Sequence, residues 1–271
     1  MIEFEQNRVV EPASTVRAMA RQVLEGRWTE ALLVSVLMYV ITTVPSLVIP
    51  YLTQTTFALS AVNAYSLIIT GPAALGMCIY FVHVFREQPG GVEHLLRGFQ
   101  YASKAIMLFV LIVVRVFFLS LLLILPGIWA ALRYSQAFFI LADSPEKTAR
   151  QCLWESSLLM RNNIGKLFWL EASFLGWALL ASMPPAFGLT VRTFAGSGIL
   201  FPPLFGWKEV ANLWLEQASS PLHPLFALLG TGSLFLGIYM GVAHACFYDL
   251  ANGNLKVQRA EDIRSISDGE L

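Results

Sequence analysis

The hydrophobic pattern of this chain consists of apolar runs that are too long to belong to the core of a soluble domain. A hydrocarbon layer of about 30 Å requires roughly 20 helical residues, and all but one of the runs reach that length. Polar residues separate neighbouring runs, as they do where a chain leaves a bilayer. The pattern predicts an all-α, multi-pass membrane bundle with six spans, at residues 30–49, 65–85, 104–125, 127–142, 166–187 and 225–248.

The third and fourth runs are divided by the dipeptide Pro126-Gly127, which predicts a turn where the chain reverses its direction. Only about 16 residues follow this turn before the next polar segment, fewer than a full crossing needs. The span at 127–142 therefore either crosses off-centre or is a broken, re-entrant piece.

Two segments outside the spans show the pattern of an amphipathic helix on the cytoplasmic side. At residues 14–25 the apolar positions recur at i, i+3, i+4, i+7 and i+8, so this helix either lies flat on the inner membrane surface or packs against the rest of the protein. The triplet Asp143-Ser144-Pro145 predicts the start of a second such helix over about 145–161. Serine is a frequent capping residue, and proline suits a first helical turn.

The Lys and Arg residues beside the spans indicate the orientation, because the cytoplasmic side of a membrane protein carries their excess. With the N-terminus inside, fourteen of the 18 basic residues fall in inner segments, and only Arg192 and Lys208 fall in outer ones. Residues 1–27 contain no apolar run, so we expect no cleaved signal peptide. We expect one membrane domain at residues 1–252 and a cytoplasmic polar tail at 253–271, with both termini in the cytoplasm.

The composition supports a membrane protein and argues against several other classes. Apolar residues make up 56% of the chain and charged residues only 13%, about half the charged share of soluble domains. The 18 basic and 18 acidic residues cancel, so no nucleic-acid partner is expected. The three cysteines show no ligand spacing, and no HExxH, GxSxG, Walker A or GxGxxG motif occurs. We therefore expect no metal, no cofactor and no enzymatic activity.

Three charged residues fall within predicted spans, where a charge costs about 2.5–3.5 kcal/mol at mid-depth. At 1.5 Å per residue, Arg115 lies ~16 Å, Arg133 ~13 Å and Glu171 ~8 Å from the inner ends of their spans. An arginine can reach toward the inner face along its flexible stem. We hypothesise that Glu171 pairs with Arg133 or Arg115 and thereby fixes the helix register. A substrate or proton site, and snorkelling of the arginines to water, are the alternatives.

Small residues recur at positions where helices could pack closely. The last span carries Ser233, Gly237, Gly241 and Ala245 at steps of four, a spacing that lets another helix backbone approach. In the second span, small residues surround a proline and predict a similar contact or a kink, at Gly71 and Gly76.

Several of these motifs, taken in order, resemble a bacterial membrane protein family known as domain of unknown function 975. The resemblance rests mainly on Pro126-Gly127-Ile128, on the Leu-Arg-Tyr-Ser-Gln-Ala segment at 132–137 and on Ala-Asp-Ser-Pro at 142–145. The Ser-Phe-Leu-Gly-Trp segment at 173–177 agrees as well, and the similarity covers about residues 14–250. The resemblance implies a multi-pass helical protein of the bacterial cell membrane, without an established activity to transfer.

Three functions are compatible with these features. The first is a non-enzymatic scaffold, regulator or accessory of a cell-envelope process, whose partners are the lipid bilayer and either another membrane protein or a second copy of this chain. The second is a transporter or permease subunit with a polar site around Arg115, Arg133 and Glu171; a continuous polar cavity reaching all three would favour it. The third is a membrane-embedded lipid enzyme, which a cluster of Asp143, Asp249 and His83 facing a cleft would favour.

Overall fold

The computed structural model describes the backbone of residues 8–53, 57–86, 88, 91–197 and 232–254. Every regular element in these ranges is an α-helix, as expected from the apolar runs. In chain order the helices are α1 (Ala13–Leu24), α2 (Trp28–Thr53), α3 (Phe57–Phe85), α4 (Val92–Gln100), α5 (Ala102–Leu122), α6 (Ile124–Tyr134), α7 (Ala137–Asp143), α8 (Ala149–Leu159), α9 (Ile164–Ser197) and α12 (Gly232–Ala251).

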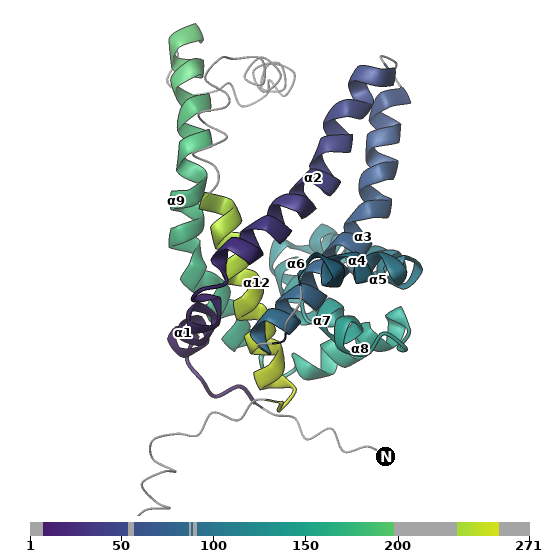
Figure 1. The fold of residues 1–271 in the computed structure, drawn as a ribbon, viewed down its shortest axis with the longest axis vertical. Helices are drawn as coiled ribbons and strands as arrows, with labels where there is room; N and C mark the ends of the chain where they lie inside the picture. The colour runs from purple at the N-terminus through teal and green to yellow at the C-terminus, as the bar shows by residue number, and fades with distance from the viewer. Residues whose placement is uncertain (1–7, 54–56, 87, 89–90, 198–231, 255–271) are drawn as a thin grey trace, which may run out of the picture.

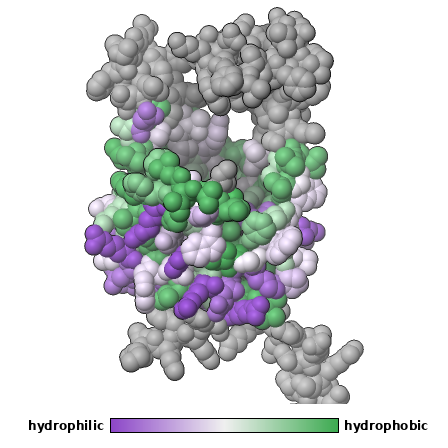
Figure 2. Space-filling model, turned by 180° about the vertical axis from the view of Figure 1, so that it is seen from behind, coloured by the Kyte–Doolittle hydropathy of each residue, from purple (hydrophilic) through white to green (hydrophobic). Residues whose placement is uncertain are grey.

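The long helices α2, α3 and α9 rise toward one end of the molecule, whereas α1, α7 and α8 gather at the other (Figure 1). Within the part of the chain that the structure describes, four stretches could cross a membrane by length and composition, namely Trp28–Pro45, Ala61–Phe85, Ala102–Leu122 and Gly232–Ala251. Apolar residues form a band across the face in Figure 2, and hydrophilic residues gather below it. Helices suit such a band, because they satisfy their own backbone hydrogen bonds where water is absent. The protein is thus all-helical, with apolar helices compatible with a membrane protein.

The fourth predicted span is interrupted, which is one of the two forms that its length allowed. α6 has 11 residues and α7 has 7, so neither alone is long enough for the hydrocarbon layer. The break falls at Ser135 and Gln136, where the Ser135 hydroxyl donates to the Leu132 carbonyl oxygen at 2.8 Å. Gln136 is fully buried, and α7 packs Phe139 and Ile140 into the core. The interruption therefore directs α7 into the protein interior.

The fifth predicted span lies within α9, which continues well beyond residue 187 to a total of 34 residues. At 1.5 Å per residue this helix is about 51 Å long, more than the hydrocarbon layer requires. The first two predicted spans, 30–49 and 65–85, are also extended by their helices. α2 continues to Thr53 and α3 begins at Phe57, so the connection between them is shorter than the predicted 50–64. Hydropathy marks where lipid begins and ends, but a helix can continue past that boundary.

The reversal between α5 and α6 comes earlier than the predicted turn at Pro126-Gly127. Leu123 is extended, with φ −165° and ψ 155°, and separates the two helices. Pro126 lies near the start of α6, where its missing N–H leaves no hydrogen bond unmade. A Cβ on Gly127 would lie 2.0 Å from the Ser120 Oγ atom, so glycine lets α6 fold back closely onto α5.

The helix predicted to begin near Pro145 begins later, at Ala149, and its cap is Thr148 instead of Ser144. The Thr148 hydroxyl accepts from the Gln151 N–H at 3.3 Å, while the Gln151 side chain accepts from the Thr148 N–H at 2.8 Å. This capping box satisfies two N–H groups at once, which Ser144 cannot do. Asp143 closes α7, and Ser144 and Pro145 form the turn between α7 and α8.

The N-terminal amphipathic helix packs against the rest of the protein, which is one of the two placements that its pattern allowed. Val16, Ala20 and Leu24 of α1 are buried, and the Tyr239 hydroxyl of α12 donates to the Arg17 carbonyl oxygen at 2.9 Å. The segment before α1 is held by α9, because Lys166 Nζ donates to the Val10 carbonyl oxygen at 2.8 Å.

A further amphipathic helix, α4, lies in the connection between the second and third predicted spans, where no helix was expected. It buries His94, Leu95 and Gly98. A Cβ on Gly98 would lie 2.4 Å from the Gly76 backbone nitrogen, so α4 lies directly on the backbone of α3. Nine residues are too short a segment for its pattern to stand out beside the long apolar runs.

Candidate functional site

Arg86, which directly follows α3, ties three helices together at the end of the molecule where the short helices gather. Its Nη2 and Nε atoms donate to the two carboxylate oxygens of Asp249 at 2.7 and 3.1 Å, and Nη1 donates to Asp143 Oδ1 at 2.7 Å. The Tyr248 hydroxyl donates to the second Asp143 oxygen at 3.2 Å. Since Asp143 closes α7 and Asp249 lies in α12, one guanidinium joins α3, α7 and α12. We call these four residues the Arg86 cluster.

The Arg86 cluster contains two partly buried ion pairs that share one guanidinium. The Asp249 side chain is 5% exposed, whereas Arg86 and Asp143 are 29% and 27% exposed. The hydrogen bond to Asp249, opposed in part by burial and supported by Asp143, raises the pKa of the Arg86 guanidinium above its ordinary value. A two-point contact between guanidinium and carboxylate also fixes the relative orientation of the two groups. The cluster therefore holds the helix ends in one arrangement.

The sequence suggested Asp143 and Asp249 as a cluster with His83 and did not indicate Arg86 as their partner. A signal was present, because Arg86 is the first basic residue after the second apolar run and both aspartates sit where apolar runs end. What the sequence lacks is the lateral order of the helices, which decides whether these three ends meet.

Glu171 is paired with His244 of α12, and not with Arg133 or Arg115 as hypothesised. The two side chains form a hydrogen-bonded contact between His244 Nε2 and Glu171 Oε1 that links α9 to α12, with 31% and 19% of the Glu171 and His244 side-chain surfaces exposed. His244 also stacks on Phe139 of α7, with ring centroids 6.4 Å apart. The sequence gives the depth of each charge along its helix but not the direction in which its side chain points. The predicted arginine partner of Glu171 is therefore wrong.

Both arginines contact aromatic rings instead. The Arg115 guanidinium carbon lies 5.9 Å from the centroid of the Tyr134 ring, and that of Arg133 lies 4.9 Å from the Trp129 ring. A guanidinium over an aromatic face is stabilised by the negative face of the ring. Because α6 folds back onto α5, Arg115 lies beside α6, whereas Arg133 points to the junction of α6, α8 and α9. The three charged residues therefore do not share a site.

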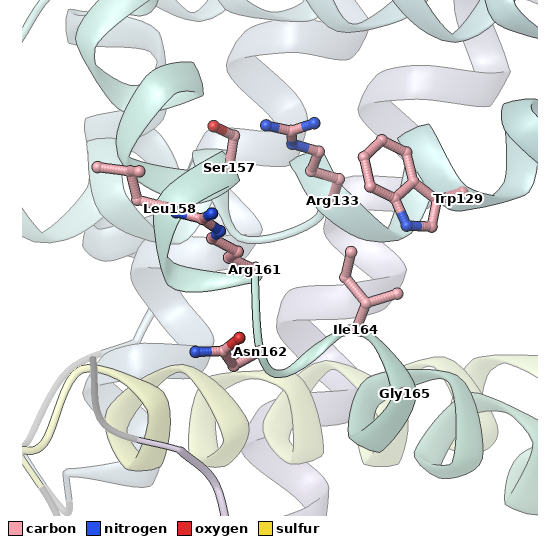
Figure 3. Close-up of a pocket in the computed structure, with 8 residues that line it drawn as sticks. All are labelled: Trp129, Arg133, Ser157, Leu158, Arg161, Asn162, Ile164 and Gly165. Atoms are coloured by element: carbon pink, nitrogen blue, oxygen red, sulfur yellow. The ribbon is translucent and has the colours of Figure 1, made fainter.

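Arg133 lines a cavity of ≈ 470 Å³ at that junction (Figure 3). Arg161, in the turn between α8 and α9, contributes a second guanidinium, and Ser157 contributes a hydroxyl from α8. In Figure 3 the Arg133 side chain extends from α6 toward Ser157. The cavity thus combines two cationic groups with hydrogen-bonding and apolar side chains; its lining residues are Trp129, Arg133, Ser157, Leu158, Arg161, Asn162, Ile164 and Gly165.

His83 does not join Asp143 and Asp249 in a catalytic arrangement. Its Nδ1 atom lies 2.8 Å from the Ile79 carbonyl oxygen, and its ring stacks on that of His94 with centroids 3.9 Å apart. The two carboxylates, in turn, are both bound to Arg86. These contacts serve to pack α4 on α3 and to hold the helix ends.

The predicted small-residue positions have different surroundings. A Cβ on Gly71 would lie 2.8 Å from the Ala105 carbonyl oxygen of α5, and one on Gly76 would lie 2.3 Å from the Leu95 carbonyl oxygen of α4. A Cβ on Gly241 would meet the Phe81 ring at 2.2 Å, so this glycine makes room for α3.

The rest of the α12 stripe is not uniform. Ala245 is fully buried, whereas Ser233 and Gly237 are exposed, and a Cβ on Gly237 would meet no atom within 4 Å. A step of four residues turns by about 40° on a helix of 3.6 residues per turn, so the stripe drifts away from the α3 face toward its N-terminal end.

No curated protein and no solved structure matches this chain. A sequence profile described as protein of unknown function (DUF975) matches residues 100–254, which is more than half of the 271 residues. The matched segment contains α5 to α9 and α12, and thus both the cavity at Arg133 and the two aspartates that bind Arg86. The chain belongs to the DUF975 family of proteins of unknown function.

Proposed function

We propose that the protein is a six-span integral protein of the bacterial cell membrane with both termini in the cytoplasm. The contacts between segments that were predicted to lie inside support this topology. Lys104, near the start of α5, donates to the Pro145 carbonyl oxygen at 2.6 Å. The start of α5 and the segment that follows α7 therefore lie on the same side of the protein. Arg86 brings the ends of α3, α7 and α12 to that same side.

We infer that the protein acts as a non-enzymatic scaffold or accessory of a cell-envelope process. The observation that carries this proposal is that Asp143 and Asp249 engage Arg86 while Glu171 engages His244. Each of these carboxylates links different helices. These carboxylates are therefore engaged in contacts that hold a fixed assembly of helices, which a scaffold or accessory requires.

The surface that would receive a partner is the exposed side of α5. Its stretch is the most apolar of the four candidate spans, and only 11% of it is buried within the chain. Phe117 and Phe118 are 57% and 66% exposed. Aromatic side chains contribute large contact areas, so this side of α5 suits another membrane helix as well as lipid.

In-cell photocrosslinking tests the accessory role. A photoreactive phenylalanine at position 118, which is 66% exposed, is compared with one at Ile68 of α3, an apolar residue that is 57% exposed. We expect position 118 to give a discrete protein adduct that position 68 does not give. A mass of twice the chain identifies a second copy as the partner. Lipid adducts alone at both positions, or the same protein adducts at both, would contradict the proposal.

The transporter alternative is less well supported. It requires Arg115, Arg133 and Glu171 around one polar cavity, whereas their neighbours are Tyr134, Trp129 and His244 respectively. The lipid-enzyme alternative requires free carboxylates near His83, and both aspartates bind Arg86 instead.

A further inference from the structure

We propose that the cavity between α6, α8 and α9 is a binding site for the phosphate group of an anionic phospholipid. The site is formed by two guanidinium groups from different elements, Arg133 at the end of α6 and Arg161 in the turn before α9. Within the described part of the chain, neither is paired with a carboxylate. Two guanidinium groups facing one cavity suit a phosphate, because each presents N–H donors in the fork geometry that phosphate oxygens accept.

The position of Arg133 is set before any ligand arrives. The Ser156 hydroxyl of α8 donates to the Arg133 carbonyl oxygen at 2.9 Å, which anchors the end of α6 on α8. The Trp129 ring lies against the guanidinium, 4.9 Å from its carbon to the ring centroid. Holding a side chain in its binding position in this way reduces the entropy that binding would otherwise cost.

The remaining groups that line the cavity also favour an anion. Ser157 and Asn162 add polar side chains, and Ile164 and Gly165 belong to the first turn of α9. The start of a helix carries a partial positive charge, which favours an anion beside the two arginines. A volume of ≈ 470 Å³ falls in the range of about 300–1,000 Å³ that small-molecule sites occupy.

A lipid is the favoured source of this phosphate because an apolar surface leads to the cavity. Leu125, Ile128 and Trp129 recur at i, i+3 and i+4 along α6 and are 78%, 45% and 45% exposed. Trp129 itself lines the cavity, together with Leu158 and Ile164. Acyl chains can follow the exposed side of α6 while the headgroup reaches the arginines. Only this choice of source rests on the proposed membrane placement, since a soluble phosphate could enter the same cavity.

The test uses the full chain purified in an uncharged detergent and measures bound lipid by native mass spectrometry. The probes are phosphatidylglycerol, which carries a net negative charge, and phosphatidylcholine, which carries none. We expect phosphatidylglycerol to bind at least about tenfold more tightly. Arg161→Gln, at an exposed position, should weaken phosphatidylglycerol binding by about tenfold and phosphatidylcholine binding by less, because the choline group already offsets the charge of that lipid's phosphate. Arg133→Lys, which keeps the charge but loses the fork, should have a smaller effect in the same direction.

The matched control is Arg150→Gln, which removes an exposed arginine from α8 outside the cavity and should leave lipid binding within about twofold of the original value. Binding of inorganic phosphate that weakens in Arg161→Gln, with no preference for phosphatidylglycerol over phosphatidylcholine, would support the phosphate site but identify its source as soluble. Equal binding of the two lipids without phosphate binding would overturn the proposal. So would equal weakening by Arg150→Gln and Arg161→Gln, because it would indicate general surface charge. None of these readouts depends on whether α5 has a partner.

Discussion

Replacing Arg86 by glutamine should destabilise the protein more than breaking the Lys147–Glu155 ion pair, whose carboxylate is less buried than that of Asp249. The substitution leaves Asp249, with only 5% of its side chain exposed, without its two-point partner. The remaining donor on this carboxylate is the Asn254 side-chain amide at 3.1 Å. The ends of α3, α7 and α12 then lose the group that joins them.

The expected cost follows from the burial of Asp249. Removing one partner of a buried pair costs about 3–5 kcal/mol, because an uncompensated charge remains. Since Arg86 and Asp143 are 29% and 27% exposed, water can partly replace the lost contact to Asp143, and we expect the lower half of this range, about 3–4 kcal/mol. At roughly 2–4 °C per kcal/mol for a chain of this size, the Tm should fall by about 6–16 °C.

The assay is the thermal melting of the full chain in detergent, followed by tryptophan fluorescence and by size-exclusion chromatography of heated samples. The control is Lys147→Gln, which breaks the Lys147–Glu155 pair; its 2.7 Å contact is as short, but its side chains are 31% and 18% exposed. Because Glu155 is 18% exposed against 5% for Asp249, and loses one contact instead of two, this loss should be smaller, about 1–2 kcal/mol. The double variant Arg86→Gln with Asp249→Asn, which removes the buried negative charge, should recover part of the loss.

An Arg86→Gln protein that melts within about 2 °C of the original, or no lower than Lys147→Gln, would refute this reasoning. Alkaline pH should not reproduce the effect. A basic group whose pKa is raised on folding contributes stability below its unfolded pKa and loses it only as the pH rises through the folded value. Because hydrogen bonding to Asp249 raises the pKa of Arg86 above its already high ordinary value, Arg86 should keep its positive charge at every working pH.

Three further predictions concern packing and capping, each measured as the Tm in detergent. Gly98→Ala should cost several °C, because the added Cβ would lie 2.4 Å from the backbone of α3, and an unchanged Tm would contradict the close contact of α4. Gly241→Leu should destabilise by colliding with Phe81, whereas Gly237→Leu in the same helix should melt normally; equal behaviour of the two variants would contradict the packing assigned to α12. Thr148→Ala should cost about 1 kcal/mol by removing the α8 cap, and no loss would mean that the capping box is dispensable.

The features that could be predicted from the sequence are those that depend on local pattern. Long apolar runs determine that the chain forms apolar helices, because a backbone in lipid has few other ways to satisfy its hydrogen bonds. The helix at residues 14–25 was predicted almost to the residue, since its apolar positions recur with the helical period. The cap of α8 was predicted at Ser144 from the Asp-Ser-Pro motif, whereas the Thr-x-x-Gln capping box at residues 148–151, an equally local signal, is the one that forms.

What only the tertiary structure decided is which helices face one another. Arg86, Asp143 and Asp249 meet because the ends of α3, α7 and α12 lie side by side, and no spacing along the chain encodes that meeting. Glu171 binds His244 instead of an arginine for the same reason, since depth along a helix does not specify its rotation. The cavity at Arg133 and Arg161 likewise exists only because α6 stops short and folds back beside α8 and α9. Local sequence determines helices, whereas lateral order and rotation come from packing among residues distant in the chain.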